Sequence, residues 1–158
     1  MKRLWIMRHG EAAQGTPDSR RELTQRGRDE VSSMAKWLAA SLDTSRDRLR
    51  ILASPYVRAQ QTAAIVAEQL GTQVESLAMI TPDDPVQPVI EWLQEDAQQG
   101  PLLLISHMPL VGRLSGRLVE GDLRSSLRMQ TAAIAALQAE VWAAGCAELL
   151  DFRSPADI

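Results

Sequence analysis

Short apolar runs alternate with longer amphipathic stretches through the first two thirds of the chain. In the longer stretches apolar residues recur about every three or four positions, which is typical of a helix with one buried face. We expect strands and helices in alternation, with strands at 2–7, 49–53, 73–77 and 102–106, and helices following Thr24 and at 56–70 and 86–98. This succession predicts an α/β domain with a mainly parallel sheet.

Local signals predict where three of these helices begin or end. Thr24 can cap the first helix, because a threonine hydroxyl accepts a hydrogen bond from a free amide of the first turn. Gly71 follows the second helix at the position where glycine commonly ends one. Asp83 or Asp84 is expected to cap the helix that starts near Val86.

The last third of the chain is less clearly patterned. Residues 130–144 alternate only in part and are rich in alanine, so periodicity alone does not choose between helix and strand. Gly145 and the apolar run at 147–152 suggest a closing hairpin. No repeat or linker divides the 158 residues, which suffice for one domain with a substantial core. We expect residues 1–158 to form a single domain.

Charge and cysteine content narrow the function classes. The formal net charge is −3 and no dense basic block occurs, which argues against a nucleic-acid-binding surface. Cys146 is the single cysteine, which excludes an internal disulfide framework and a thiolate zinc site and fits a reducing compartment. No signal-peptide pattern opens the chain, and no apolar run nears the ~20 residues that span a bilayer. A cytoplasmic protein that binds neither nucleic acid nor membrane is expected.

The two histidines of the chain occupy equivalent places. His9 and His107 each directly follow an apolar strand, in LWIMRHGE and LLLISHMP. Functional loops of a doubly wound sheet gather outside the carboxyl ends of its strands, so the two imidazoles could meet in one crevice. Each could instead be a hydrogen-bonded structural histidine, but the matching positions favour a functional pair.

Arginines accompany both histidines. Arg8 and Arg58 follow strand ends on the same side of the predicted sheet, and the planar fork of a guanidinium matches phosphate oxygens. Arg21 is a third candidate, and Arg20 beside it is its competitor; a solvated surface position is the alternative for each. Histidines and arginines without a thiolate or carboxylate cluster indicate metal-free phosphoryl transfer. One imidazole would attack phosphorus, while the cations and a second, protonated histidine would stabilise the developing charge.

Four motifs occur between Lys2 and about Val119 in the order RHGE, LTQRG, SPYVRAQQTA and ISHMP. In this order they resemble the histidine phosphatase superfamily, the branch that includes the cofactor-dependent phosphoglycerate mutases, and the short length is similar to its bacterial phosphohistidine phosphatases. The resemblance implies a three-layer α/β/α fold with a central, mainly parallel mixed sheet and no cap domain. It also favours a strand at 132–139.

The resemblance further implies a role for each candidate residue. His9 would be the nucleophile that becomes phosphohistidine, and His107 would be the second histidine of the phosphate pocket. Phosphate-binding roles would fall to Arg8, Arg21 and Arg58. No cofactor and no metal are expected.

One feature of the superfamily is missing from the motifs. Larger members have a carboxylic acid that protonates the leaving oxygen, but no acid directly follows His107. Glu11, Asp83 and Asp84 are the nearest alternatives, and each has a simpler structural explanation. A phosphate ester needs such an acid, whereas the more labile P–N bond of phosphohistidine tolerates its absence.

The expected function is therefore a protein phosphohistidine phosphatase. Its partner would be a histidine phosphotransfer domain or phosphocarrier of a bacterial relay, and it would act as a monomer. Two alternatives remain open, a small-molecule phosphomonoesterase of the same superfamily and a phosphate-binding module without turnover.

Overall fold

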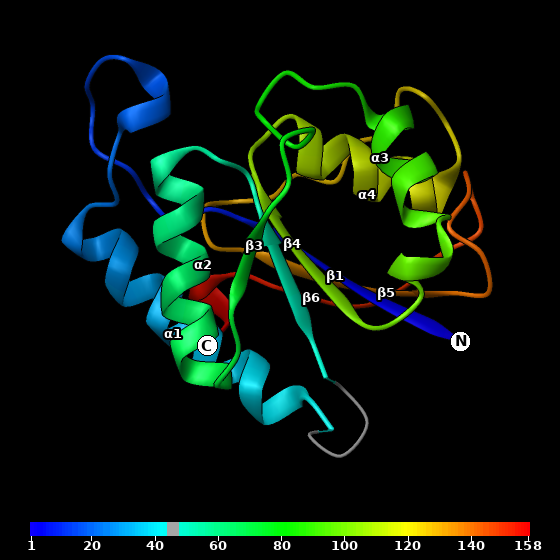
Figure 1. Ribbon diagram of the computed structural model, residues 1–158, viewed down its shortest axis with the longest axis horizontal. Helices are drawn as coiled ribbons and strands as arrows, with labels where there is room; N and C mark the ends of the chain where they lie inside the picture. The colour runs from blue at the N-terminus through cyan, green and yellow to red at the C-terminus, as the bar shows by residue number, and fades with distance from the viewer. Residues whose placement is uncertain (44–47) are drawn as a thin grey trace.

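The computed structural model describes residues 1–43 and 48–158. Within these residues the chain forms a six-stranded sheet in the order β3-β2-β4-β1-β5-β6 (Figure 1). The strands are β1 (Lys2–Arg8), β2 (Arg50–Ala53), β3 (Val74–Ser76), β4 (Leu102–Ser106), β5 (Ile134–Ala139) and β6 (Glu148–Arg153). The pairs from β3 to β1 are parallel, and β5 pairs antiparallel with β1 and β6. The predicted mixed, mainly parallel sheet is confirmed.

Helices cover both faces of this sheet. Those of the described residues are α1 (Gln25–Ser41), α2 (Val57–Leu70), α3 (Val86–Leu93) and α4 (Leu110–Glu120). Successive residues of β1 point to opposite faces. Leu4 and Ile6 are buried in the cluster that contains α3 and α4, whereas Trp5 and Met7 are buried with α1 and α2. The sheet is therefore the middle of three layers, as predicted.

Two of the predicted helix boundaries are confirmed. The Thr24 side chain accepts a hydrogen bond from the amide of Gly27 at 2.9 Å and caps α1. Gly71 ends α2 in the left-handed conformation, with φ of 68°. Such a positive φ costs glycine little because it has no Cβ.

The capping role expected of Asp83 or Asp84 is wrong. Pro85 stands at the N-cap of α3 without a side-chain cap. The Asp84 carboxylate reaches back instead and accepts hydrogen bonds from the backbone and hydroxyl of Thr81, at 2.8 and 2.6 Å. It therefore stabilises the preceding turn, and α3 ends at Leu93, before the predicted limit.

Helix α4 is absent from the sequence prediction, although Leu110, Leu114 and Leu118 recur along it at helical spacing. Gly112 and Gly116 allow another segment to approach closely. A Cβ at these glycines would lie 2.5 Å from the carbonyl oxygen of Leu127 and 2.4 Å from that of Ser125. The helix is thus packed against the backbone of the following loop.

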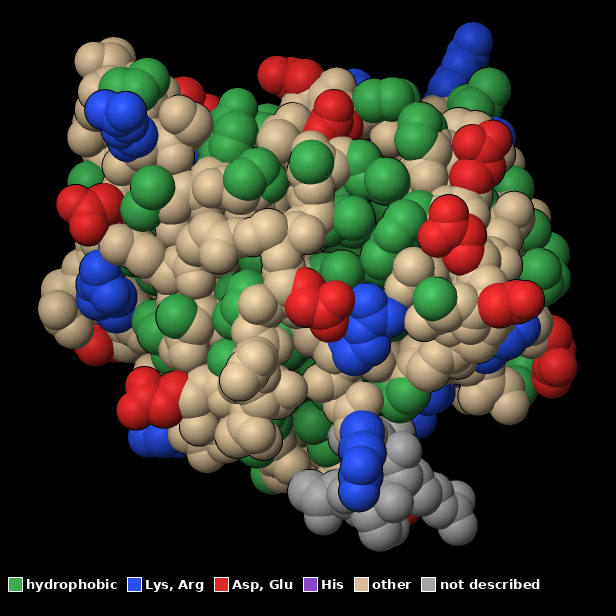
Figure 2. All heavy atoms as spheres, in the orientation of Figure 1, with side chains coloured by type: hydrophobic (Ala, Val, Ile, Leu, Met, Phe, Trp, Pro, Cys, Tyr) green, Lys and Arg blue, Asp and Glu red, His purple; other side chains and the backbone are tan. Residues whose placement is uncertain are grey.

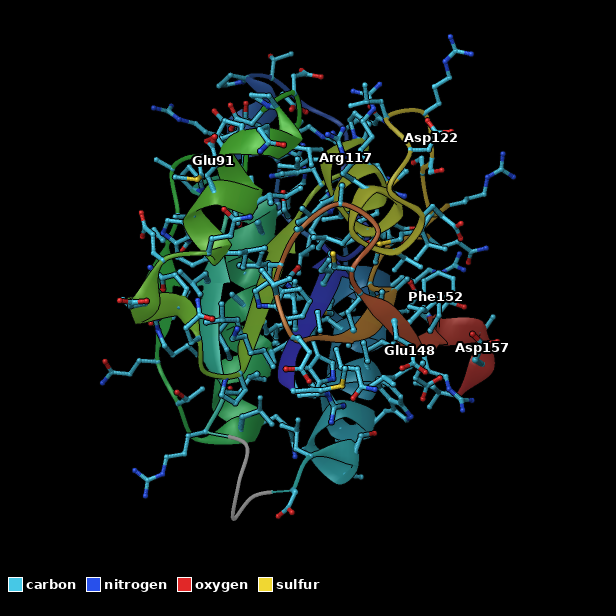
Figure 3. The ribbon with its side chains drawn as sticks, turned by 90° about the vertical axis from the view of Figure 1, so that its right-hand side faces the viewer. Glu91, Arg117, Asp122, Glu148, Phe152 and Asp157 are labelled. Atoms are coloured by element: carbon cyan, nitrogen blue, oxygen red, sulfur yellow. The ribbon has the colours of Figure 1, made fainter. Side chains whose placement is uncertain are left out.

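The last two strands form the expected hairpin. The alanine-rich segment is strand β5, as the family resemblance implied, although the strand begins at Ile134 rather than at residue 132. β6 pairs with it antiparallel and forms an edge of the sheet. Figure 3 shows Glu148 and Phe152 on this edge and Asp157 in the short turn that follows.

Surface charge is mixed on the face seen in Figure 2, where acidic and basic side chains are interspersed. Among the described helices none is long and apolar enough to cross a membrane.

The first turn of α1 provides a test of the packing beneath the RHGE motif. A Cβ at Gly27 would lie 2.2 Å from the carbonyl oxygen of Glu11. Alanine favours a helix over glycine by about 1 kcal/mol, but forcing an atom into a packed backbone costs about 1–3 kcal/mol. The difference leaves a net loss, so we expect Gly27→Ala to lower the free energy of unfolding in urea by up to about 2 kcal/mol. Gly100→Ala is the control, because no atom lies within 4 Å of its new Cβ. Equal stability of the two variants would contradict the tight contact.

Candidate active site

Two neighbouring strand ends bring the histidines together. The register of β1 and β4 pairs Arg8 with Ser106. His9 and His107 therefore follow side by side at the carboxyl ends of these two parallel strands. The His9 amide donates to the carbonyl of Ser106 at 2.9 Å, and the ring centroids of the histidines lie 5.0 Å apart. His9 is 6% exposed and His107 is 1% exposed. Residues nearly a hundred positions apart in sequence thus form one buried pair.

The backbone of Gly10 determines which nitrogen of His9 is available. His9 Nδ1 lies 2.7 Å from the carbonyl oxygen of Gly10. A carbonyl only accepts, so Nδ1 carries the proton and Nε2 keeps its lone pair. The Gly10 amide donates to Oγ1 of Thr62 at 3.0 Å, and the Thr62 hydroxyl donates to the carbonyl of Arg58 at 2.8 Å. This chain of bonds ties the turn after β1 to helix α2.

Burial also keeps His9 neutral. It lowers the pKa of His9 from 6.5 to about 4, against the opposing effect of the Gly10 carbonyl. The charges of Arg58, Arg8 and Arg21 lower this pKa further. A neutral imidazole with an unprotonated Nε2 is the form that can attack phosphorus.

Arg58 lies in the first turn of α2 and is 4% exposed. Its Nε donates to Nε2 of His9 at 3.3 Å. Its two terminal nitrogens donate to Asp18, one to the backbone oxygen at 2.7 Å and one to Oδ2 at 3.1 Å. The guanidinium also lies 5.2 Å from the ring centroid of Tyr56. These contacts hold a cation beside the His9 lone pair.

Arg8 approaches the histidines from the end of β1. One terminal nitrogen donates to the carbonyl of Met129 at 3.0 Å, whereas its buried Nε has no hydrogen-bond partner. Burial lowers the pKa of Arg8, and the charge of Arg58 lowers it further. An unpaired, buried donor of this kind suits an anionic ligand.

Asp18 joins two of the candidate arginines, and the sequence analysis missed it. Arg21 donates from one terminal nitrogen to Oδ1 of Asp18 at 3.0 Å and from Nε to the carbonyl of Ala13 at 2.8 Å. Arg58 binds the other carboxylate oxygen. Arg20, the competitor of Arg21, is exposed. A single acid in an irregular loop carries no periodic signal, so nothing in the pattern marked Asp18.

The Asp18 carboxylate is held in its ionised form. The Asp18 side chain is 55% exposed, and the partial loss of water around it raises its pKa, but the hydrogen bond and charge of Arg58, together with Arg21, outweigh this and lower the pKa below its ordinary value. Asp18 therefore carries no proton to donate at neutral pH.

His107 is the second imidazole of the pair. Burial lowers its pKa to about 3, and His9 and Arg58 lower it as well, against the opposing charge of Asp18. The ligand-free protein thus holds His107 neutral, and the protonated second histidine expected during phosphoryl transfer stays a prediction for the ligand-bound state. A bound dianion would raise its pKa.

Comparison with known proteins places this arrangement in a family. A sequence model of the histidine phosphatase superfamily (branch 1) matches residues 4–81. Phosphohistidine phosphatase SixA of Escherichia coli K12 is 40% identical over 124 residues, which cover 75% of this chain and 75% of that protein. The chain belongs to the histidine phosphatase superfamily.

Two further relatives extend the similarity. The SixA homolog of Haemophilus influenzae is 37% identical over 126 residues, covering 73% of this chain and 76% of that one. The solved structure of the protein histidine phosphatase SixA complexed with tungstate superposes with a TM-score of 0.85 at 34% identity. That superposition covers 98% of this chain and 97% of the other, so the histidine phosphatase fold extends along nearly its whole length.

Two of the three acids considered as proton donors in this histidine phosphatase are engaged elsewhere. Glu11 accepts a hydrogen bond from the hydroxyl of Thr24 at 2.7 Å, and Asp84 binds Thr81. Asp83 is exposed. The described residues contain no group of three or more histidines, cysteines or acids placed to hold a metal ion.

The neutrality of His9 can be measured directly. In an NMR titration we expect the ring of His9 to protonate with a midpoint near 4, well below the ordinary value of 6.5. The unfolded chain takes up this proton at higher pH than the folded chain. The free energy of unfolding should therefore decrease as the pH falls from 6.5 toward 4. The same titration in concentrated urea is the control, and a folded-state midpoint near the urea value would contradict the burial effect.

Asp18 occupies guanidinium groups that a phosphoryl group would also bind. We expect Asp18→Asn to tighten the binding of tungstate or inorganic phosphate several-fold, because a neutral amide competes less for Arg58 and Arg21. Isothermal titration calorimetry measures the affinity. Asp83→Asn is the matched control, since it removes the same charge from an exposed site. Weaker oxyanion binding by Asp18→Asn alone would show that the carboxylate organises the arginines rather than competing for them.

Proposed function

We propose that the protein is a phosphohistidine phosphatase that transfers the phosphoryl group to His9 and then to water. The observation that carries this proposal is the unprotonated Nε2 of a neutral, buried His9, whose lone pair accepts a 3.3 Å hydrogen bond from Arg58 Nε. Relatives at 40% and 37% identity named as phosphohistidine phosphatase SixA and its homolog support the same reaction.

The first step would form one bond and break another at phosphorus. Nε2 of His9 attacks, and the P–N bond of the substrate breaks, with the electron pair passing to the leaving imidazole. Arg58 Nε, which now donates to His9 Nε2 at 3.3 Å, would turn to a phosphoryl oxygen as the lone pair engages phosphorus. The buried Nε of Arg8 would supply another donor to the developing charge. Water then attacks phosphorus, the Nε2–P bond breaks with its electron pair returning to His9, and phosphate is released.

The protonation state of Asp18 favours phosphohistidine over a phosphate ester. Asp18 is the acid that the described contacts bring to Arg58 and Arg21; like any aspartate it is ionised at neutral pH, and the arginines lower its pKa further. An alkoxide leaves poorly without a proton from an acid. The imidazole of phosphohistidine is a better leaving group, which water can protonate. A small-molecule phosphomonoesterase is therefore the alternative function, and the substrate comparison below distinguishes the two.

The partner in this proposal is a protein that carries the phosphohistidine, such as a histidine phosphotransfer domain or a phosphocarrier of a bacterial relay. A cytoplasmic location and a monomeric state belong to the same proposal. His107, Arg8, Arg21 and Arg58 would bind the phosphoryl oxygens, with His9 as nucleophile.

A side-by-side substrate panel tests the function. We expect kcat/KM for a phosphohistidine phosphocarrier to exceed that for sugar phosphates and p-nitrophenyl phosphate at one pH, because no protonated acid assists ester cleavage. Brief incubation with labelled substrate should give an acid-labile, alkali-stable phosphoenzyme, which His9→Ala abolishes. The Arg20→Ala variant is the control and should retain activity.

Either of two results would count against the proposal. Faster hydrolysis of a sugar phosphate than of every phosphohistidine protein would favour the phosphomonoesterase. Label retained by His9→Ala would exclude His9 as nucleophile.

A further inference from the structure

Ser54 lies at the end of β2, directly beneath the histidine pair. It is fully buried, and its backbone amide donates to the carbonyl of Ile105 at 3.0 Å, which fixes it to β4. Its hydroxyl oxygen lies 2.8 Å from Nε2 of His107. The same oxygen accepts a hydrogen bond from the amide of Tyr56 at 3.2 Å. Ser54 therefore contacts one histidine of the pair, His107, through its hydroxyl.

The other ring nitrogen of His107 has no partner among the protein atoms. Nδ1 is buried and makes no hydrogen bond. The ring lies between that of His9 and that of Tyr56, with a centroid distance of 5.0 Å to each. Buried polar groups are nearly always paired, so this nitrogen requires an explanation.

Counting hydrogen-bond partners distinguishes the two neutral tautomers of His107. If Nε2 carried the proton, it would donate to Ser54, whose oxygen already accepts from Tyr56. The Ser54 hydroxyl hydrogen would then lack an acceptor among the described residues, and the Nδ1 lone pair would lack a donor. If Ser54 donates to Nε2 instead, only the Nδ1 proton is unpaired. Unpaired buried groups are destabilising, so the second arrangement is favoured.

We infer that Ser54 is a positioning residue that holds His107 with its proton on Nδ1, ready to donate to an oxygen of the phosphoryl group transferred to His9. This inference rests on the proposed function. The opposite tautomer would turn a lone pair toward the anion and repel it. The tautomer matters because His107 is neutral in the ligand-free protein, where burial lowers its pKa. The Ser54 hydroxyl, which does not contact the substrate, would thus determine which nitrogen of the His107 ring carries the proton and donates.

The tautomer can be read without any substrate. In ¹⁵N-labelled protein at pH 7, two-bond ¹⁵N–¹H correlations of the imidazoles distinguish a protonated Nδ1 from a protonated Nε2. We expect His107 of the natural chain to carry its proton on Nδ1, and tungstate to shift this nitrogen. A proton on Nε2 in the natural chain would overturn the inference, whatever the variants do.

Substitution links the tautomer to the reaction. Ser54→Ala removes the donor to Nε2, so we expect the spectrum to move toward the Nε2-protonated form. We expect kcat for the phosphohistidine substrate to fall about 10- to 100-fold with little change in KM, somewhat less than the loss of a direct oxyanion donor. Ser54→Thr keeps the hydroxyl and should restore much of the rate and the Nδ1 proton. Loss of rate without a change of tautomer would reduce Ser54 to a packing role and overturn the inference.

Ser115→Ala is the matched control. Ser115 is 1% exposed, and its hydroxyl donates to the carbonyl of Val111 at 2.7 Å within α4. This variant also removes a buried hydroxyl, but it should leave the tautomer and kcat unchanged.

A protein that fails to hydrolyse phosphohistidine would refute the proposed function, while the tautomer and the tungstate shift would still test Ser54.

Discussion

Parallel pairing of β1 with β4 determines where the reactive groups of this histidine phosphatase lie. The register aligns Arg8 with Ser106, so that a histidine is the next residue of each strand, and the His9 amide bonds back across the pair. β4 also pairs in parallel with β2, so Ser54, which follows β2, lies at the carboxyl ends of the same strands. A slip of one residue would turn the side chains of β1 to the opposite face of the sheet. One backbone register thus sets distances among groups that are remote in sequence.

Burial then determines the electrostatics of these groups. The imidazoles lose most of their contact with water and stay neutral, while the arginines keep their charge and repel one another. The Asp18 carboxylate compensates by bonding Arg21 and Arg58 together. A phosphoryl group that binds these cations would exchange one anion for another, which limits the cost of removing the arginines from water. The ligand-free site is thus organised around a charge of the sign that it would bind.

The sequence predicted the features that apolar patterning or a local signal encodes. Strands such as 102–106 and the Thr24 cap follow from residues that are neighbours in the chain. The predicted helix cap at Asp83 or Asp84 was wrong. The Asp84 carboxylate lies between the turn at Thr81 and the start of α3, and the sequence does not show which of the two it will bind. Asp18 and Ser54 were missed for a different reason. Their partners, Arg58 and His107, are distant in sequence, and a single polar residue gives no sign of which distant group it will meet.

The contacts of Ser54 and Asp18 together suggest why the substrate should be a phosphoramidate. Ser54 can hold a neutral His107 as a donor, and Asp18 is ionised, with a pKa that its arginines lower further. Among the described residues that contact the histidine pair or its arginines, the ligand-free site offers hydrogen-bond donors and a nucleophile, but no protonated carboxylic acid. Such a site can stabilise a transferring phosphoryl group but gives little help to an alkoxide that must leave. Selectivity for a labile P–N bond would then arise from the protonation states of these residues, before any surface of a partner protein is recognised.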